Sequence, residues 1–411
     1  MSQAADAGPD APSLHGYRWA MLGGVWLLYF CFGLTVASTG PLVQAIVEDL
    51  GISHSAMGSV MGAWPLVYIG AALPCGALLD RFGPRFALTG AAAIIALSGF
   101  LRAGAEGHLS LFLAVAVFGL GGPLVSIGAP KVIALWFEGK ERGLAMGLYI
   151  TGMALGSIAA LALTNSVMMP LLGGDWRAVL VVYATVSLAI GVAWLTLSAH
   201  AASRAVERNL AAESKRPQLE IFRDLLRLPA VRIVLAMSIF IFFINHGLNN
   251  WLPEILRSRG LSPAAAGYWA AIPTAIGLLG AILIPRLAIP SRRLAILLLL
   301  FLSATGATLL LHLQPGIGLA TGLVLQGIAR SSMMTLAILV LVEIPEVGSR
   351  HAGSAGGLFF SAAEIGGVLG PLTLGLMFDA TGGFTASLFL LSGVCALLVL
   401  LLALLRGHHR H

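Results

Sequence analysis

Charged residues are scarce in this chain. Asp, Glu, Lys and Arg together make up 10% of its 411 residues, whereas apolar residue types make up 58%. Soluble domains carry about 25% charged residues, and the mean hydropathy of +0.92 also lies far on the apolar side. This composition excludes a water-soluble globular protein, because most of these side chains cannot face water. We therefore expect a lipid bilayer around the chain.

Cysteines are few, and the common catalytic motifs are absent. Cys31, Cys75 and Cys395 all fall inside apolar segments, which excludes a disulfide framework and a cysteine metal site. The sequence contains no GxxxxGK[ST] loop, no HExxH and no GxSxG motif. We therefore expect no enzyme activity, no cofactor or metal, and no direct use of ATP.

Long apolar runs are what the sequence does contain. A lipid core about 30 Å thick is crossed by roughly 20 apolar residues in a helix, because every backbone polar group must be satisfied inside the segment. Twelve such segments predict an all-α membrane protein with twelve transmembrane helices. Their expected limits are 18–46, 55–79, 85–104, 109–137, 142–169, 176–199, 229–252, 263–285, 292–313, 316–343, 350–377 and 384–406.

A charged stretch from His200 to Leu228 separates the first six segments from the last six. It predicts a water-exposed linker between two six-helix bundles. The expected domains are an N-terminal tail (1–17), the first bundle (18–199), the linker (200–228), the second bundle (229–406) and a C-terminal tail (407–411).

The basic residues predict the orientation, because Lys and Arg concentrate in cytoplasmic loops. The side that holds both termini and the linker receives most of them. The opposite side receives Arg102, Arg177, Arg257 and Arg259. We therefore expect a multi-pass protein of the cytoplasmic (inner) membrane with both termini in the cytoplasm. The same bias accounts for the net charge of +6, so that charge does not indicate a nucleic-acid partner.

The two halves of the chain echo each other 208 residues apart. Arg85 corresponds to Arg293, and Arg142 corresponds to Arg350. Repeated six-span halves are typical of carriers in which one half rocks against the other around a central site.

The loop after the second span reads GALLDRFGPR from Gly76 to Arg85. Together with the division into six and six spans, this loop resembles the major facilitator superfamily over essentially the whole chain. The resemblance implies two pseudo-symmetric six-helix bundles and a gate at the cytoplasmic end. The expected gating residues are Gly76, Asp80, Arg81, Gly83, Arg85 and Arg142.

Simple chemistry accounts for three of these positions. Gly76 would permit close helix contact, Asp80 would face a helix N-terminus or an arginine, and Gly83 would allow a tight turn. The counterpart loop in the second half has Ala288 where Asp80 would repeat, so we expect a weaker latch there.

A finer resemblance lies between the seventh and eighth spans. The segment NNWLPEILRSRGLSPAAAGYW, from Asn249 to Trp269, is similar to the corresponding segment of the cyanate and 2-nitroimidazole branch of the superfamily.

Arg330 is placed deepest among the charges in the apolar spans. It lies about 14 residues from Gly316 and about 13 from Glu343, hence roughly 20 Å from each end of a helix rising 1.5 Å per residue. A charge there costs at least about 2.5 kcal/mol unless it faces water or a partner. A guanidinium can hold a carboxylate through two parallel hydrogen bonds. We interpret Arg330 as an anion-binding residue with Gln326 one turn away; a structural ion pair is the alternative.

Glu364 and one face of the seventh span supply further polar groups. Glu364 either neutralises Arg330 or takes up a proton during transport, and a structural role stays open. His246, Asn249 and Asn250 share a helix face through i, i+3, i+4 spacing, which predicts a cavity wall or interhelical hydrogen bonds.

These residues predict a secondary carrier that moves a small organic or inorganic anion by alternating access, as a monomer in the bilayer. Protons are the expected coupling ion, carried by Glu364 or His246. A carrier of cationic or zwitterionic molecules, or a membrane sensor that moves nothing, are the alternatives. The expected substrate-binding residues are Arg330, Gln326, His246, Asn249, Asn245, Tyr29 and Trp64.

Overall fold

The structure is a computed structural model of the whole chain, and it describes residues 11–208 and 218–408. The side chains of Asp80 and Arg350 lie outside the described part. The described elements are helices: α1 (Ala11–Ala37), η1 (Gly40–Leu42), α2 (Val43–Leu50), α3 (His54–Ala103), α4 (His108–Trp136), α5 (Gly139–Leu163), η2 (Thr164–Met168), α6 (Met169–Leu171), α7 (Trp176–Leu197), α8 (Ala201–Arg208), α9 (Gln218–Arg227), α10 (Pro229–Ser258), α11 (Pro263–Leu287), α12 (Arg293–Leu310), α13 (Ile317–Val342), α14 (Gly348–Thr381) and α15 (Thr385–His408).

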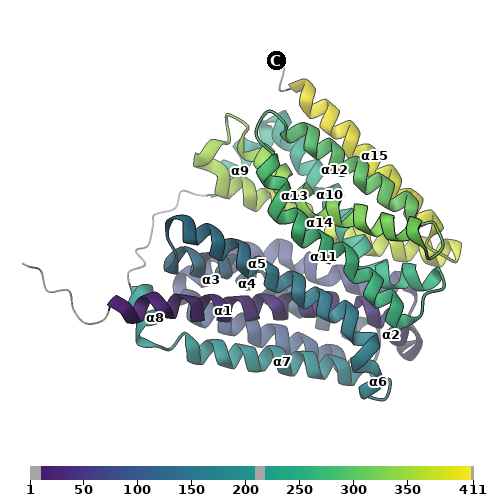
Figure 1. Cartoon of the computed structure of the whole chain (residues 1–411), viewed down its shortest axis with the longest axis horizontal. Coiled ribbons are helices and arrows are strands. Elements are labelled where there is room, and N and C mark those ends of the chain that lie inside the picture. Colours follow the sequence, from purple (N-terminus) through teal and green to yellow (C-terminus); the bar gives the residue numbers. More distant parts are fainter. Residues whose placement is uncertain (1–10, 209–217, 409–411) are drawn as a thin grey trace, which may run out of the picture.

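The helices form two bundles, one built from α1–α7 and the other from α10–α15 (Figure 1). Within the described residues, 11 helical segments are long and apolar enough to cross a membrane. The part of α3 before Gly83 supplies the remaining predicted span. The predicted all-helical membrane fold of two bundles is thus confirmed. The exact domain limits stay predictions.

The predicted second and third spans are joined in one helical stretch. Helix α3 runs from His54 to Ala103, and its backbone leaves the helical region at Gly83, where φ is 74° and ψ is 165°. A positive φ is accessible to glycine because it has no Cβ. The loop expected between the two spans is therefore reduced to a sharp break at one residue.

The predicted first span is broken instead of continuous. Helix α1 ends at Ala37, and the chain continues through η1 with Pro41 in its first turn. The buried Arg102 side chain supports this break, because Nη1 donates to the Thr35 carbonyl oxygen at 3.3 Å and to Thr39 Oγ1 at 3.4 Å. Carbonyl groups at a helix C-terminus lack partners within the helix, so this arginine satisfies one of them. Arg102, at the end of the predicted third span, was counted among the basic residues of the membrane surface and is only 2% exposed.

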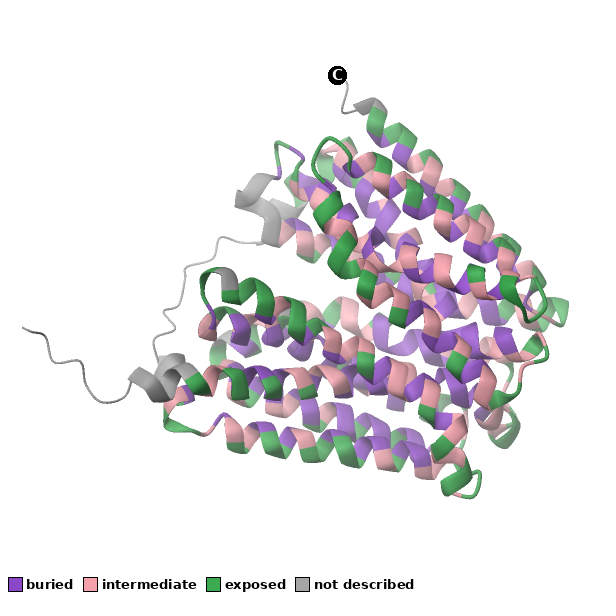
Figure 2. Ribbon diagram, in the orientation of Figure 1, coloured by how far each residue is buried: buried purple, intermediate pink, exposed green. Residues whose placement is uncertain are grey.

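The outer surface of the molecule is apolar. Val192, Leu299 and Leu400 are each more than half exposed on the outside of their helices. Figure 2 shows buried residues running through the interior of both bundles and exposed ones along their outer faces. Apolar surface of this extent needs a cover other than water, and the membrane supplies it.

The two bundles meet at the end of the molecule opposite the linker helices α8 and α9, which we call the distal end. A Cβ at Gly58 of α3 would lie 2.5 Å from the Pro371 carbonyl oxygen of α14, and one at Gly62 would lie 2.9 Å from that of Val368. Figure 1 shows the bundles converging there and diverging toward α8 and α9. Glycine thus allows backbone-to-backbone contact between the bundles at the distal end.

Close packing inside the second bundle gives a test of the fold. A methyl group at Gly366 of α14 would overlap the Ile239 carbonyl oxygen of α10, whereas one at Gly356 of the same helix meets nothing within 4 Å. We expect Gly366→Ala to cost about 1–3 kcal/mol of stability through overpacking. Gly356→Ala should be neutral or stabilising by up to about 1 kcal/mol, because alanine favours the helix. Melting temperatures in one detergent compare the pair, and equal effects would contradict the packing of α14 on α10.

Candidate functional site

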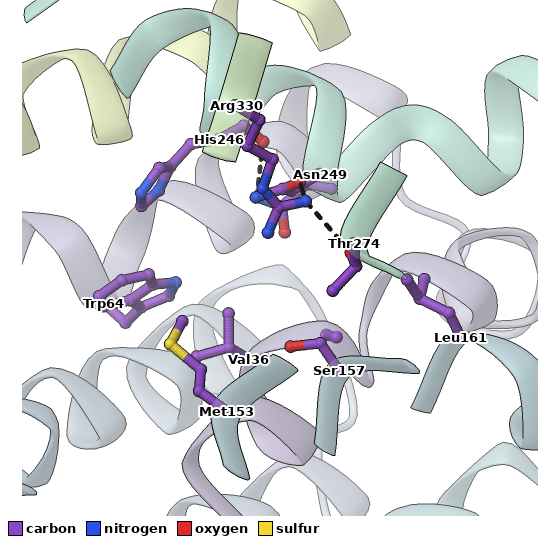
Figure 3. A pocket seen from close by; sticks show the side chains of 11 residues that line it. Val36, Trp64, Met153, Ser157, Leu161, His246, Asn249, Thr274 and Arg330 are labelled. Atoms are coloured by element: carbon purple, nitrogen blue, oxygen red, sulfur yellow. Dashed lines mark hydrogen bonds between the residues drawn. The ribbon is translucent and has the colours of Figure 1, made fainter. Parts of the chain in front are cut away.

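A small cavity of about 80 Å³ lies between the two bundles. Figure 3 shows side chains from both bundles facing each other across it. The lining residues are Val36, Ala37, Trp64, Met153, Ser157 and Leu161 from the first bundle, and His246, Asn249, Asn250, Thr274 and Arg330 from the second.

Arg330 projects into this cavity from the middle of α13. Its Nη1 donates hydrogen bonds to Asn249 Oδ1 of α10 and, at 3.3 Å, to Thr274 Oγ1 of α11 (Figure 3). Three helices therefore fix the position of one guanidinium. Among the described residues, neither of these partners carries a negative charge, so the cation is oriented without being neutralised.

The polar face predicted on the seventh span lies on this cavity. His246, Asn249 and Asn250 of α10 all line it, and Asn250 Nδ2 donates to the His246 carbonyl oxygen at 2.9 Å. Asn245 is partly buried and is not among the lining residues.

The His246 ring lies between two aromatic rings. The Trp64 ring of α3 stacks on it with centroids 5.3 Å apart, and the Phe242 ring of α10 does so at the same distance. Trp64 belongs to the opposite bundle, so this stack is a direct contact between bundles beside the cavity.

Glu364 lies next to His246 and away from Arg330. A Cβ at Gly367 would lie 2.5 Å from Glu364 Oε2 and 3.2 Å from His246 Nδ1, so both side chains border the same empty position. Glu364 is 4% exposed, and its Oε2 has no hydrogen-bond partner within the described part of the chain. The expectation that Glu364 neutralises Arg330 is wrong for this conformation, because Arg330 instead bonds to Asn249 and Thr274.

A second cavity, of about 150 Å³, continues from the first toward the linker end. Arg330, Thr274, Met153 and Ser157 line both cavities. The additional lining comes from α5, α11 and α13 and consists of Ile150, Ala154, Pro273, Gly277, Leu278, Ala281 and Ser331. Helix α11 runs toward the linker end, so Gly277 and Ala281 lead from Arg330 in that direction.

The sequence profile of the Major Facilitator Superfamily matches residues 25–316 of the chain. The chain belongs to this superfamily. It is therefore a transporter and not an enzyme.

Individual relatives agree with this assignment. The transporter YycB of Bacillus subtilis (strain 168) is 26% identical over 93% of this chain and 91% of its own length. The probable sulfoacetate transporter SauU of Cupriavidus necator is 24% identical over 92% of this chain and 90% of its own. A crystallised variant of the nucleoside transporter NupG has the same fold, with a TM-score of 0.80 and 17% identity over 94% of this chain and 99% of its own. These relatives do not support the cyanate and 2-nitroimidazole branch.

Three expected substrate-binding residues, Asn245, Gln326 and Tyr29, lie outside both cavities, and several residues that were not expected line them. Gln326 is buried one turn before Arg330, and its Oε1 lacks a hydrogen-bond partner among the described residues. Tyr29 packs against Phe32 and Tyr149 inside the first bundle. Among the lining residues that sequence reasoning missed are Met153, Ser157 and Thr274. Ser157 and Thr274 are isolated hydroxyls in apolar spans, and this isolation was the one feature of the sequence that could have indicated a place on the cavity.

The superfamily's loop motif lies at the linker end of α3. A Cβ at Gly76 meets nothing within 4 Å, so the expected close helix contact at Gly76 is absent in this conformation. Arg81 lies over the Phe82 ring, and the Arg85 guanidinium lies 4.9 Å from the Phe86 ring centroid. Their roles in gating stay predictions, as does that of Asp80.

Two further arginines at the linker end hold helix termini. Arg142 donates to the Phe137 carbonyl oxygen at 2.8 Å and to that of Ala134 at 3.0 Å, which caps the end of α4. Arg293, the counterpart of Arg85, pairs with Glu343 at the end of α13 and donates to the Ala288 carbonyl oxygen at 3.2 Å. The second half thus has an ion pair where the loop sequence predicted a weaker latch.

A contact that the sequence did not reveal joins the bundles at the distal end. Asp379, near the end of α14, accepts hydrogen bonds from the backbone N–H groups of His54 at 3.1 Å and Ser55 at 2.8 Å. These groups begin α3, so a carboxylate of one bundle caps a helix of the other. A negative charge at a helix N-terminus is stabilised by the free N–H groups and the helix dipole.

Removing this cap should loosen the distal end. We expect Asp379→Ala to cost about 0.5–2 kcal/mol of the contact between the bundles, which raises the population of a distally open form about 2- to 30-fold. Asp175→Ala is the matched control, because Asp175 caps α7 within its own bundle by accepting from the Arg177 N–H at 2.8 Å.

Spin labels on cysteines introduced at the exposed Glu106 and Gln314, one in each bundle, report the distal separation. Asp379→Ala should add a population with a longer distance between the two labels, whereas Asp175→Ala should leave the distribution of label distances unchanged. Identical distributions for both variants would show that the cap does not hold the bundles together.

Proposed function

We propose that this protein is a secondary carrier that moves a small anion across the cytoplasmic membrane by alternating access. The observation that carries the proposal is Arg330, a cation in a cavity between the bundles. Among the described residues that line the two cavities, Arg330 is the sole charged side chain. An uncompensated charge inside a membrane protein is costly, so a substrate of opposite charge gains by occupying the site.

The names of relatives support an organic anion. SauU is named for sulfoacetate, and other relatives are named for tartrate, galactarate/D-glucarate and 4-hydroxybenzoate. One relative, from Acinetobacter baumannii, is named a quinolone resistance transporter.

The conformation supports alternating access. The distal contacts of α3 with α14 close one end, and the cavities extend from Arg330 toward the other. The concentration of Lys and Arg in the linker and nearby loops supports a cytoplasmic location for that other end, because basic loops stay on the cytoplasmic side. The described state would then be the one that exchanges substrate with the cytoplasm. Both bundles that form the site come from one chain, which fits a monomer.

Arg330→Gln tests the proposal directly. Loss of two charge-assisted hydrogen bonds, each worth about 1.5–3 kcal/mol, should weaken anion binding by at least about 100-fold. Arg232→Gln is the control, because it removes the same charge from an exposed residue near the linker end of α10. Titrations of purified protein with hexanoate, adipate, gluconate and sulfoacetate measure the effect. Anion binding that survives Arg330→Gln would refute the proposal.

Glu364 and His246 are the proposed proton-coupling residues. Glu364 of α14 is buried without a cationic partner among the described residues. It lies beside His246 of α10, which is one helix turn from Asn249, the residue that holds Arg330. A carboxyl group there can take up a proton without breaking an ion pair.

Glu364→Gln should separate coupling from binding. We expect the variant to keep substrate exchange across proteoliposomes but to lose accumulation driven by a pH gradient, because glutamine cannot release a proton. Glu254→Gln is the control, since Glu254 pairs with Arg257 at 2.9 Å in the distal part of α10. Gradient-driven accumulation that persists in Glu364→Gln would exclude Glu364 as the coupling residue.

The cation-carrier alternative has weaker support. Glu364 is not among the residues that line either cavity, so no described carboxylate faces the space where an amine would bind. Amine binding that is insensitive to Arg330→Gln would favour that alternative, and binding without flux would favour a sensor.

A further inference from the structure

The cavity wall that faces Arg330 is mainly apolar. It comes from the first bundle and consists of Val36, Ala37, Trp64, Met153 and Leu161, with the Ser157 hydroxyl and the Trp64 indole N–H as its polar groups (Figure 3). The other polar groups of the cavity come from the second bundle, on α10, α11 and α13. A substrate that contacts both bundles therefore meets a mainly polar wall on the second bundle and a mainly apolar wall on the first.

The second cavity extends the apolar wall. Ile150, Ala154 and Leu278 line it, and Arg330 again supplies the charge. No second cation lies among the described lining residues of either cavity. A second negative charge therefore finds no cationic partner among these lining residues, and the hydrogen-bonding side chains belong mostly to the second bundle.

The guanidinium is arranged for one anionic group. Both of its described hydrogen bonds leave from Nη1, to Asn249 and Thr274. The edge formed by Nε and Nη2 is the edge that matches the two oxygens of a carboxylate. Asn249 and Thr274 are therefore positioning residues that fix which edge is presented.

We infer that the substrate is a monoanion with an apolar body, whose single carboxylate or comparable group binds Arg330 while its hydrocarbon part lies against Val36, Met153 and Leu161. This inference rests on the proposed anion transport and narrows its substrate class. Met153, which lines both cavities opposite Arg330, determines specificity against a second charge.

Physical costs favour this class over dicarboxylates and sugar acids. A second carboxylate would leave water for an apolar wall without a partner, and an unpaired buried charge is strongly unfavourable. The hydroxyls of a sugar acid that face Val36, Met153 or Leu161 would lose their hydrogen bonds to water without gaining a partner. An apolar chain gains about 0.8 kcal/mol per buried CH₂ group at the same place.

A matched series of six-carbon ligands tests the inference on the purified full-length protein. Hexanoate has one charge and an apolar chain, adipate has two charges, gluconate has one charge and five hydroxyls, and hexanamide has no charge. We expect hexanoate to bind at least tenfold more tightly than adipate, gluconate and hexanamide. Adipate or gluconate binding as tightly as hexanoate would overturn the inference.

A gain-of-specificity variant tests the role assigned to Met153. Met153→Lys places a second cation opposite Arg330 and should improve adipate binding relative to hexanoate at least tenfold, whereas Met153→Leu should preserve the original preference. An unchanged ratio in a folded Met153→Lys would remove Met153 from the specificity role. If Met153→Lys does not fold, Ser157→Lys places the cation one helix turn away and is held to the same expectation.

The outcomes separate this inference from the proposed function. Failure of every anion to bind, or hexanoate binding that ignores Arg330→Gln, would refute anion transport itself. Anion binding that depends on Arg330 but favours adipate or gluconate would leave anion transport in place and refute the substrate class alone.

Discussion

The interaction on which the site depends is the clamp on Arg330 by Asn249 and Thr274. An arginine in the interior of a membrane bundle persists only where polar partners or water compensate its charge. Here the partners are neutral oxygens on two neighbouring helices, so they hold the guanidinium in place and leave its charge available. A carboxylate in their place would neutralise the site and compete with any anion. The choice of an amide and a hydroxyl thus keeps the cavity electropositive while still satisfying part of the arginine.

The contacts between the bundles determine which way this electropositive cavity opens. At the distal end, Gly58 and Gly62 of α3 allow the backbone of α14 to approach closely, and Asp379 caps the first turn of α3. Backbone contacts of this kind depend on a specific register of two helices. A rotation of the bundles breaks them together, and the same rotation would bring the linker ends toward each other. Closure at one end and access at the other therefore follow from one rigid-body relation.

Hydropathy and charge were sufficient to predict the architecture and the central arginine. Apolar runs of about 20 residues are forced on any membrane-spanning helix, and a lone arginine in the middle of such a run is conspicuous. Of the two partners of that arginine, Asn249 was among the expected site residues, but Thr274 was not predictable. Thr274 is one of many hydroxyls in apolar spans, and its importance arises only when α11 packs on α13. Asp379 was missed for the same reason, since its partners are backbone groups 324 and 325 residues away. The break after α1 is satisfied by the buried side chain of Arg102, whose position at the end of a predicted span suggested a basic residue at the membrane surface.

Helix α10 relates the two polar clusters of the structure. Asn249, which holds Arg330, and His246, which lies beside Glu364, are three residues apart on one helix and both face the cavity. His246 also stacks on Trp64 of the opposite bundle. A movement of one bundle against the other therefore changes the surroundings of the His246 ring, which lies beside the Glu364 carboxyl group. A substrate that draws the first bundle toward Arg330 would therefore alter the surroundings of Glu364 through α10 and Trp64. This shared helix provides a short physical route by which occupancy of the anion site and protonation of Glu364 can influence each other, without any direct contact between Arg330 and Glu364.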